Sequence, residues 1–211
     1  MTIGHGPQNR ALFSIGAPRR HTGAMALPDT IQAEGIELRR WDCAFVGEMV
    51  DAVLFSLPAL ERWMPWAQAP PRADEMRMVF SKARSDFDEG QAWNYGLFER
   101  ISGELVGSAG LHREDDRDCP EIGYWVRTDR TRRGYATQAA SALTAAAFKC
   151  LPDVQQVKIC VDQANFASAS VPRTLGYRLA RKESQPIEAK SHTGTVEIWI
   201  LRRFDQSPEA D

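Results

Sequence analysis

The sequence predicts a mixed α/β domain, and three observations lead to this prediction. Strand-like segments are mixed along the chain with segments whose apolar residues recur every three or four positions. Two adjacent strand segments, QAWNYGLFER and ELVGSAGLHR, are joined by Ile101-Ser102-Gly103, which indicates a hairpin with a short glycine-containing turn. A long helix is predicted from about Gly134 to Cys150 by small and apolar residues at helical spacing: Ala136, Ala139, Ala140, Leu143, Ala146, Ala147 and Cys150.

One strand and three helices are predicted before the hairpin. The strand is GIELRRW, and Asp42 is expected to cap the helix that follows, which has Met49 and Val53 on its apolar face. A short second helix is expected in LPALERWMPW, closed by Pro65. The third lies in PRADEMRMVFSKARSDFDEG, where helical spacing of apolar residues continues up to Gly90.

Two helices and four strands are predicted after the hairpin. The strand EIGYWVR leads into the long helix, and VQQVKICV is the next strand. NFASASVPRTL is a short helix ended by Gly176, and YRLARKE and TVEIWILRRF are the last two strands. We therefore expect one domain over residues 34–205, between a flexible arm at 1–33 and a tail at 206–211.

Composition and charge narrow the function classes. Of the 211 residues 43% are hydrophobic, enough for a core, and the formal net charge of -2 argues against general nucleic-acid binding. No apolar run approaches the ~18 residues of a membrane span, so we expect a cytoplasmic protein. The cysteines form no CxxC pair, no metal-ligand spacing is seen, and three of the four are expected to be buried: Cys43, Cys150 and Cys160.

Four arginines stand directly before the long helix, in RTDRTRRGYATQAASALTAAAF: Arg127, Arg130, Arg132 and Arg133. A helix N-terminus attracts anions, and Gly134 lets a ligand approach the backbone because it carries no side chain. The arrangement fits a pyrophosphate with a further phosphate nearby. A solvated turn and a nucleic-acid patch are the alternatives, and neither GxxxxGK[ST] nor GxGxxG is present.

Three segments resemble the GNAT superfamily of acyl-CoA-dependent N-acetyltransferases, most closely the branch that includes the ribosomal-protein N-terminal acetyltransferases. EIGYWVRTDRTRRGYATQAASALTAAAF resembles the family's strand, pyrophosphate loop and helix. NFASASVPRTLGY resembles its N-x-x-S-x-x-V-x-x-x-L-G-F/Y segment, and LERWMPWA resembles the branch's Trp-Pro-Trp region. The likeness spans about residues 36 to 204. It departs at Thr131, where Gln or Arg is usual, at Arg132, where glycine is usual, and at Pro172, where some members have a catalytic tyrosine.

The resemblance implies a GNAT fold, in which a mixed, mostly antiparallel sheet has splayed strands and flanking helices. It also implies a metal-independent enzyme that moves acetyl from acetyl-CoA to a primary amine by direct attack in a ternary complex. Acetyl-CoA is expected between the strands at 121–127 and 154–161. The residues expected to contact it are Tyr124, Trp125, Val126, Arg127, Arg132, Arg133, Gly134, Tyr135, Ala136, Thr137, Asn165 and Ser168.

Two residues are candidates for proton transfer. Glu121, which opens the strand EIGYWVR, is the candidate general base, and an exposed strand-end carboxylate is the alternative. Ser168 matches the serine of the family's N-x-x-S segment and is the candidate acid, with packing or capping as the alternative. Asn165 is expected to hydrogen-bond the pantetheine arm, to cap its helix, or both. The acidic loop at 114–116 is interpreted as solvated, and it could steer a cationic acceptor.

Trp63, Trp66 and Trp93 are the candidates for the acceptor pocket, and a core position is the alternative for each. The acceptor itself stays open between a protein N-terminus and a small-molecule amine. A non-catalytic acyl-CoA-binding protein is the alternative from another class. A homodimer through the sheet edges is one option for assembly.

Overall fold

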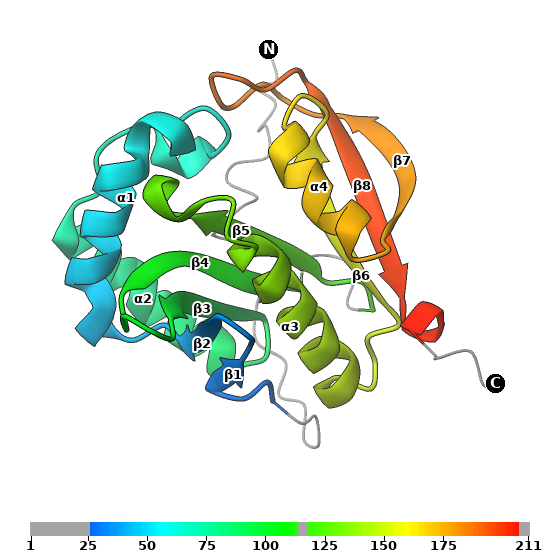
Figure 1. Cartoon of the computed structure of the whole chain (residues 1–211), viewed down its shortest axis with the longest axis horizontal. Helices are drawn as coiled ribbons and strands as arrows, with labels where there is room; N and C mark the ends of the chain where they lie inside the picture. Colours follow the sequence, from blue (N-terminus) through cyan, green and yellow to red (C-terminus); the bar gives the residue numbers. More distant parts are fainter. Residues whose placement is uncertain (1–25, 114–117, 207–211) are drawn as a thin grey trace, which may run out of the picture.

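One eight-stranded sheet organises the part of the chain that this computed structural model describes, residues 26–113 and 118–206. Its order is β1-β2-β3-β4-β5-β6-β8-β7, and every neighbouring pair is antiparallel except β5 and β6. The predicted mixed, mostly antiparallel sheet is therefore confirmed (Figure 1). The strands are β1 (Thr30–Gln32), β2 (Ile36–Arg40), β3 (Ala92–Glu99), β4 (Leu105–His112), β5 (Glu121–Val126), β6 (Gln156–Asp162), β7 (Arg178–Ser184) and β8 (Thr195–Arg202).

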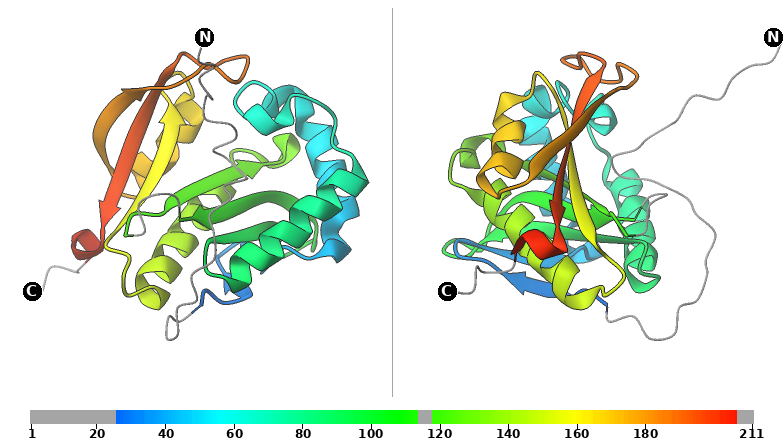
Figure 2. Two further views of the ribbon diagram at one scale, coloured as in Figure 1. Left: turned by 180° about the vertical axis from the view of Figure 1, so that it is seen from behind. Right: turned by 90° about the vertical axis from the view of Figure 1, so that its right-hand side faces the viewer.

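Two helices, α1 (Val46–Leu60) and α2 (Ala73–Asp88), cover one face of the sheet, as Figure 2 shows from behind. Asp42 caps the turn that leads into α1, as predicted, because its carboxylate accepts a hydrogen bond from the N–H of Ala44 at 2.9 Å. Met49 of α1 and Phe80 of α2 are buried in a shared cluster on this face. The predicted amphipathic faces of the two helices are thus the faces they bury.

The other face is covered by α3 (Tyr135–Cys150) and α4 (Phe166–Thr174). The predicted stripe of α3 is buried against the sheet, with Ala139, Leu143 and Ala147 fully inaccessible to solvent. Small side chains on this stripe let the helix approach the sheet closely, which fixes the position of its N-terminus relative to β5.

The gap between β5 and β6 is the feature that positions a site. These parallel strands are paired at one position, Glu121 with Lys158, and diverge beyond it (Figure 1). Their outer neighbours β4 and β8 stay paired with them along their length. The expected splay is therefore present, and it leaves backbone groups of β5 without a strand partner on one side.

Two segments differ from the prediction. α1 continues to Leu60 with Pro58 inside it, and Pro65 opens a short 3-10 turn instead of closing a second helix. The buried Leu60 anchors the last turn of α1, which outweighs the one hydrogen bond that a proline removes. The expected arm is shorter than 1–33, because β1 pairs with β2 and Leu27 is buried; residues 1–25 lie outside the described residues.

The segment Cys43–Leu60 has the length and mean hydropathy, 1.6, of a membrane-spanning helix, although no apolar run of this length was expected. Core helices can meet the same criterion. Val53 and Leu60 pack into the cluster against the sheet, whereas Leu54 and Phe55 are exposed. In this structure the segment belongs to the folded domain.

Candidate active site

A cavity of about 360 Å³ occupies the gap between β5 and β6. One wall is the β5 segment 121–125 and the other is the β6 segment 158–162. Asn165 and Ser168 of α4 line it as well, together with part of the loop between β7 and β8. Successive residues of a strand point to opposite faces, and residues of both sets line the cavity, so it is accessible from both faces of the sheet.

Polar side chains of β3 and β4 form the floor of the cavity. A Cβ atom on Gly110 would lie 2.6 Å from both Asn94 Oδ1 and His112 Nε2, so these two side chains converge over the glycine. Burial lowers the pKa of His112 to about 4, so its imidazole is neutral at pH 7. His112 is also the cross-strand partner of Glu121, which places a neutral imidazole beside the candidate base.

Glu121 lies at the start of β5 and lines the cavity. Lys158 Nζ is 3.7 Å from Glu121 Oε2, and the two side chains are 19% and 25% exposed respectively. The ion pair joins β5 and β6 at the position where they are paired and holds the carboxylate against the cavity wall. The acidic loop at 114–116 lies outside the described residues.

Ser168 is in direct contact with Tyr124. The hydroxyl of Tyr124 donates to the main-chain oxygen of Ser168 at 3.0 Å and lies 3.2 Å from its Oγ. Burial raises the pKa of Tyr124 to about 12, so this hydroxyl is protonated at neutral pH. The N–H of Ser168 donates to Asn165 Oδ1 at 3.2 Å, so Asn165 caps α4. The main-chain oxygen and the N–H of Ser168 are therefore both held by hydrogen bonds.

Trp63 and Trp66 line the cavity from the segment between α1 and α2, and Trp66 packs against Trp125 with ring centroids 6.2 Å apart. Trp93 does not line it. Trp93 is 1% exposed and belongs to the core on the α3 face, so the expectation that it contacts the acceptor is wrong. Its neighbour Asn94 faces the cavity instead, because alternate residues of β3 point to opposite faces.

The outer edge of the cavity is bridged by contacts between the end of α1 and the β7–β8 loop. Lys190 Nζ lies 2.7 Å from Glu61 Oε2, and a ring nitrogen of His192 lies 3.0 Å from the main-chain oxygen of Trp63. These segments are far apart in the sequence but adjacent in space (Figure 1).

The loop after β5, which we call the phosphate loop (residues 127–134), has a backbone suited to bind anions. Arg132 (φ +62°) and Gly134 (φ +78°) both adopt the left-handed conformation, so the chain turns sharply before Tyr135. α3 starts without a side-chain cap, which leaves first-turn N–H groups available. A Cβ atom on Gly134 would approach nothing closer than Gln138 Nε2 at 3.7 Å, so open space lies above the backbone.

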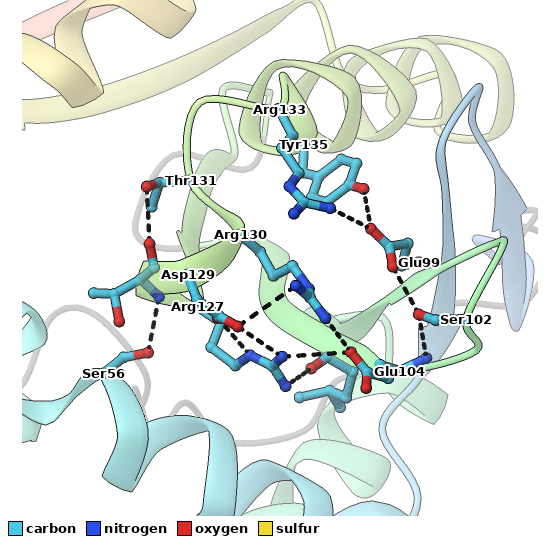
Figure 3. Close-up of polar contacts among 12 residues, drawn as sticks. Ser56, Glu99, Ser102, Glu104, Arg127, Asp129, Arg130, Thr131, Arg133 and Tyr135 are labelled. Atoms are coloured by element: carbon cyan, nitrogen blue, oxygen red, sulfur yellow. Dashed lines mark hydrogen bonds and ion pairs between the residues drawn. The ribbon is translucent and has the colours of Figure 1, made fainter.

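Two arginines of the phosphate loop are held by carboxylates (Figure 3). Arg127 Nε lies 2.7 Å from Asp129 Oδ1, and Arg130 Nη2 lies 2.5 Å from Glu104 Oε2. Glu104 Oε2 is also 3.4 Å from Arg127 Nη2. The charges of these two arginines are therefore already compensated within the protein.

Arg133 is held in the same way, because its Nη1 lies 3.0 Å from Glu99 Oε1. Arg127, Arg132 and Arg133 were all expected to contact the cofactor, but Arg127 and Arg133 are paired with carboxylates of the protein. Within the part of the chain that the structure describes, the side chain of Arg132 has no hydrogen bond or ion pair. Arg132 is the cation of this loop that remains free to meet a phosphate.

Sequence reasoning missed the floor of the cavity. A signal was present, because Ser108, Gly110 and His112 put polar or small residues at alternate positions of an otherwise apolar strand. The cysteine prediction was wrong as well: Cys43 is exposed, Cys150 and Cys160 are half-buried, and Cys119 is the buried one. Cys160 lines the cavity.

Comparisons with known proteins place this geometry in a family. The family model described as "Acetyltransferase (GNAT) domain" matches residues 36–178. "Putative ribosomal N-acetyltransferase YdaF" from Bacillus subtilis (strain 168) is 27% identical over 146 residues, which cover 68% of this chain and 78% of that protein.

Two solved structures share the fold. Mycobacterium smegmatis RimJ in complex with CoA-disulfide has a TM-score of 0.78 and 19% identity, over 88% of this chain and 93% of that one. RimL, named as ribosomal L7/L12 alpha-N-protein acetyltransferase and solved with coenzyme A, has a TM-score of 0.75 and 22% identity, over 82% of this chain and 97% of that one. With the family match over most of the domain, the chain belongs to the GNAT acetyltransferase family and is an enzyme that transfers an acetyl group from acetyl-CoA to an amine.

Proposed function

We propose that the acceptor of this acetyltransferase is the α-amine of a protein or peptide N-terminus. The observation that carries the proposal is that the candidate bases lining the cavity are weak: Glu121 is a carboxylate paired with Lys158, and burial lowers the pKa of the His112 imidazole to about 4. At pH 7 roughly a tenth of α-amines are neutral, against fewer than about one in 1,000 lysine side chains. Weak bases therefore suffice for an α-amine.

The names of similar proteins support the same acceptor class. YdaF is named as a ribosomal N-acetyltransferase and RimL as an alpha-N-protein acetyltransferase.

In the proposed complex, acetyl-CoA occupies the gap between β5 and β6. Its pantetheine arm pairs with the unpartnered backbone of β5 at residues 124–126. Its pyrophosphate binds the N–H groups of residues 132–137, where α3 begins uncapped, and its 3′-phosphate meets Arg132. The open space above Gly134 and the splay of the strands fit such a ligand.

The proposed reaction is direct attack of the neutral amine on the thioester carbonyl, in which the C–N bond forms and the C–S bond breaks. Glu121 takes the proton released by the amine, directly or through a water molecule. Ser168 donates a proton to the departing thiolate. Tyr124 stays protonated near neutral pH because burial raises its pKa to about 12, and its hydroxyl holds Ser168 in position.

The test is a comparison of three acceptors with acetyl-CoA, followed by intact mass: a peptide with a free N-terminus, the same peptide with a blocked N-terminus and an internal lysine, and spermidine. We expect acetylation of the free N-terminus at a rate far above the other two. Equal or faster modification of the blocked peptide would overturn the choice of an α-amine.

A small-molecule amine is the second candidate, and the bridged outer edge of the cavity favours it. The contacts of Lys190 with Glu61 and of His192 with Trp63 restrict a bulky acceptor. Faster acetylation of spermidine than of the free peptide would select this candidate.

We also propose a cytoplasmic location, because Cys43, Cys119, Cys150 and Cys160 are free thiols, as suits a reducing compartment. The exposed edge strands β1 and β7 are where a homodimer would form. A light-scattering mass of one chain at the working concentration would exclude that dimer.

A further inference from the structure

The β3–β4 hairpin reaches the phosphate loop through two carboxylates, Glu99 and Glu104, which we call the hairpin carboxylates. We infer that they are positioning residues for acetyl-CoA: they hold the loop arginines away from the ligand and fix the backbone that binds its phosphates. The inference rests on the proposed seat of acetyl-CoA on this loop. Figure 3 shows the contacts that carry it.

Glu99 contacts the end of the phosphate loop and the first residue of α3. Its Oε1 accepts hydrogen bonds from Arg133 Nη1 at 3.0 Å and from the hydroxyl of Tyr135, the first residue of α3. Its Oε2 accepts from Ser102 Oγ at 2.7 Å. The Glu99 side chain is only 10% exposed, so its charge depends on these partners and cannot be satisfied by water alone. One carboxylate thus fixes the last loop arginine and the start of α3.

Glu104 ties the beginning of the loop. It accepts from Arg130 at 2.5 Å and from Arg127 at 3.4 Å, and the side chains of both arginines are about four-fifths buried. Asp129 completes this cluster through Arg127 at 2.7 Å. Three carboxylates therefore balance three arginines, and the free charge of the loop is that of Arg132.

The anchored positions flank the two residues of the loop that have the left-handed conformation. Arg130 lies before Arg132, and Tyr135 lies directly after Gly134; Arg132 and Gly134 have positive φ angles. A left-handed conformation is unfavourable for a residue with a side chain and persists when the surrounding structure imposes it. Fixing both ends with the hairpin carboxylates keeps the intervening N–H groups directed at the ligand.

The direction in which the KM for acetyl-CoA changes on removal of Glu104 distinguishes a positioning role from direct binding of phosphates by the arginines. In Glu104→Gln, Arg127 and Arg130 are released. If Glu104 positions the loop, the KM for acetyl-CoA rises about five-fold, as expected for loss of a partly shielded ion pair, with kcat and the KM for the amine unchanged. If the arginines instead bind phosphates directly, releasing them lowers the KM.

The experiment measures kcat and both KM values for the wild type, Glu104→Gln, and the double variant Glu104→Gln/Arg130→Gln. The control is Asp86→Asn, which removes a carboxylate paired at 2.6 Å with Lys82 on α2, away from the loop. We expect a raised acetyl-CoA KM in Glu104→Gln, no further rise in the double variant, and no change in the control. An unchanged or lowered KM in Glu104→Gln overturns the inference. Failure of the wild type to bind acetyl-CoA would instead overturn the proposed function.

Discussion

Arg132 departs from the usual family pattern, since it stands where a glycine is common and keeps the left-handed conformation that glycine favours. It also carries the uncompensated charge of the phosphate loop, because the other loop arginines are paired. The proposed role of this bulky residue is contact with a phosphate of acetyl-CoA.

Replacing Arg132 tests this role. Arg132→Ala keeps a side chain at a left-handed position, so the backbone strain is similar and the charge is lost. We expect the Kd for acetyl-CoA to rise about ten-fold, as for loss of a hydrogen bond between charged groups, and the Kd for 3′-dephospho-CoA to stay the same. Equal weakening of both ligands would show that Arg132 supports the loop and does not meet the 3′-phosphate.

The contact between Ser168 and Tyr124 leads to a further prediction. Ser168→Ala should lower kcat about 10²-fold with little change in the KM for acetyl-CoA, because it removes the proton donor. Tyr124→Phe, which removes only the hydroxyl that holds Ser168, should lower kcat about five-fold. In the double variant, Tyr124→Phe should have no further effect. Independent, multiplying effects in steady-state kinetics would separate Tyr124 from Ser168.

The residues of the site differ in how far the sequence could reveal them. Glu121, Asn165 and Ser168 were found because they lie in segments that resemble a family, and all three line the cavity. The contacts of Tyr124 with Ser168 and of Glu99 with Arg133 join positions 44 and 34 residues apart, respectively. No local pattern records such tertiary contacts, so these could not be predicted.

Among the elements, the phosphate loop and the start of α3 depend most on one residue, Gly134, which has a positive φ angle and open space above its backbone. Gly134→Val should abolish detectable acetyl-CoA binding, because the side chain would occupy the space above the backbone and a branched residue tolerates φ +78° poorly. Gly90→Val is the matched control, since Gly90 has φ +68° at the end of α2. Equal melting temperatures with loss of binding only in Gly134→Val are expected; binding that survives in Gly134→Val contradicts the assignment of the loop.

The loop should also respond to acid. Hydrogen bonds from Tyr135 to Glu99 and from Arg130 to Glu104 lower the pKa values of both carboxyl groups. Groups with lowered pKa values contribute their stabilisation above the ordinary pKa of about 4, and lose it as the pH falls through the lowered value.

We therefore expect the Kd for 3′-dephospho-CoA, which lacks the titrating 3′-phosphate, to be constant from pH 8 to 5 and to rise below about pH 4. Calorimetric titration at each pH measures this. The Glu104→Gln variant should show a smaller rise. An equal rise in that variant would assign the acid response to other groups.

Element prediction was accurate where the pattern is local. The alanine stripe predicted α3 and the Ile101-Ser102-Gly103 turn predicted the β3–β4 hairpin, because helical periodicity and turn chemistry are properties of neighbouring residues. The separate second helix predicted in LPALERWMPW was wrong, because α1 continues through Pro58 to the buried Leu60. β1 was missed because a strand of three residues has too short a pattern to recognise.

In the molecule as a whole, the break between β5 and β6, where the two strands splay apart, creates the cavity of the candidate site. In the proposed complex the cofactor lies toward the α3 and α4 face of this break and the acceptor toward the α1 and α2 face, with Tyr124 and Ser168 on one side and Glu121 and His112 on the other. The sequence anticipated this break only through the family resemblance, since no pattern within β5 or β6 reveals that the two strands part.

The most direct test of this account is calorimetric titration of the intact protein with acetyl-CoA and, separately, with 3′-dephospho-CoA. We expect one acetyl-CoA to bind per chain, and 3′-dephospho-CoA to bind more weakly because it lacks the phosphate that Arg132 is proposed to contact. Absence of binding to both ligands would contradict the assignment of the splayed strands and the phosphate loop as the acetyl-CoA site.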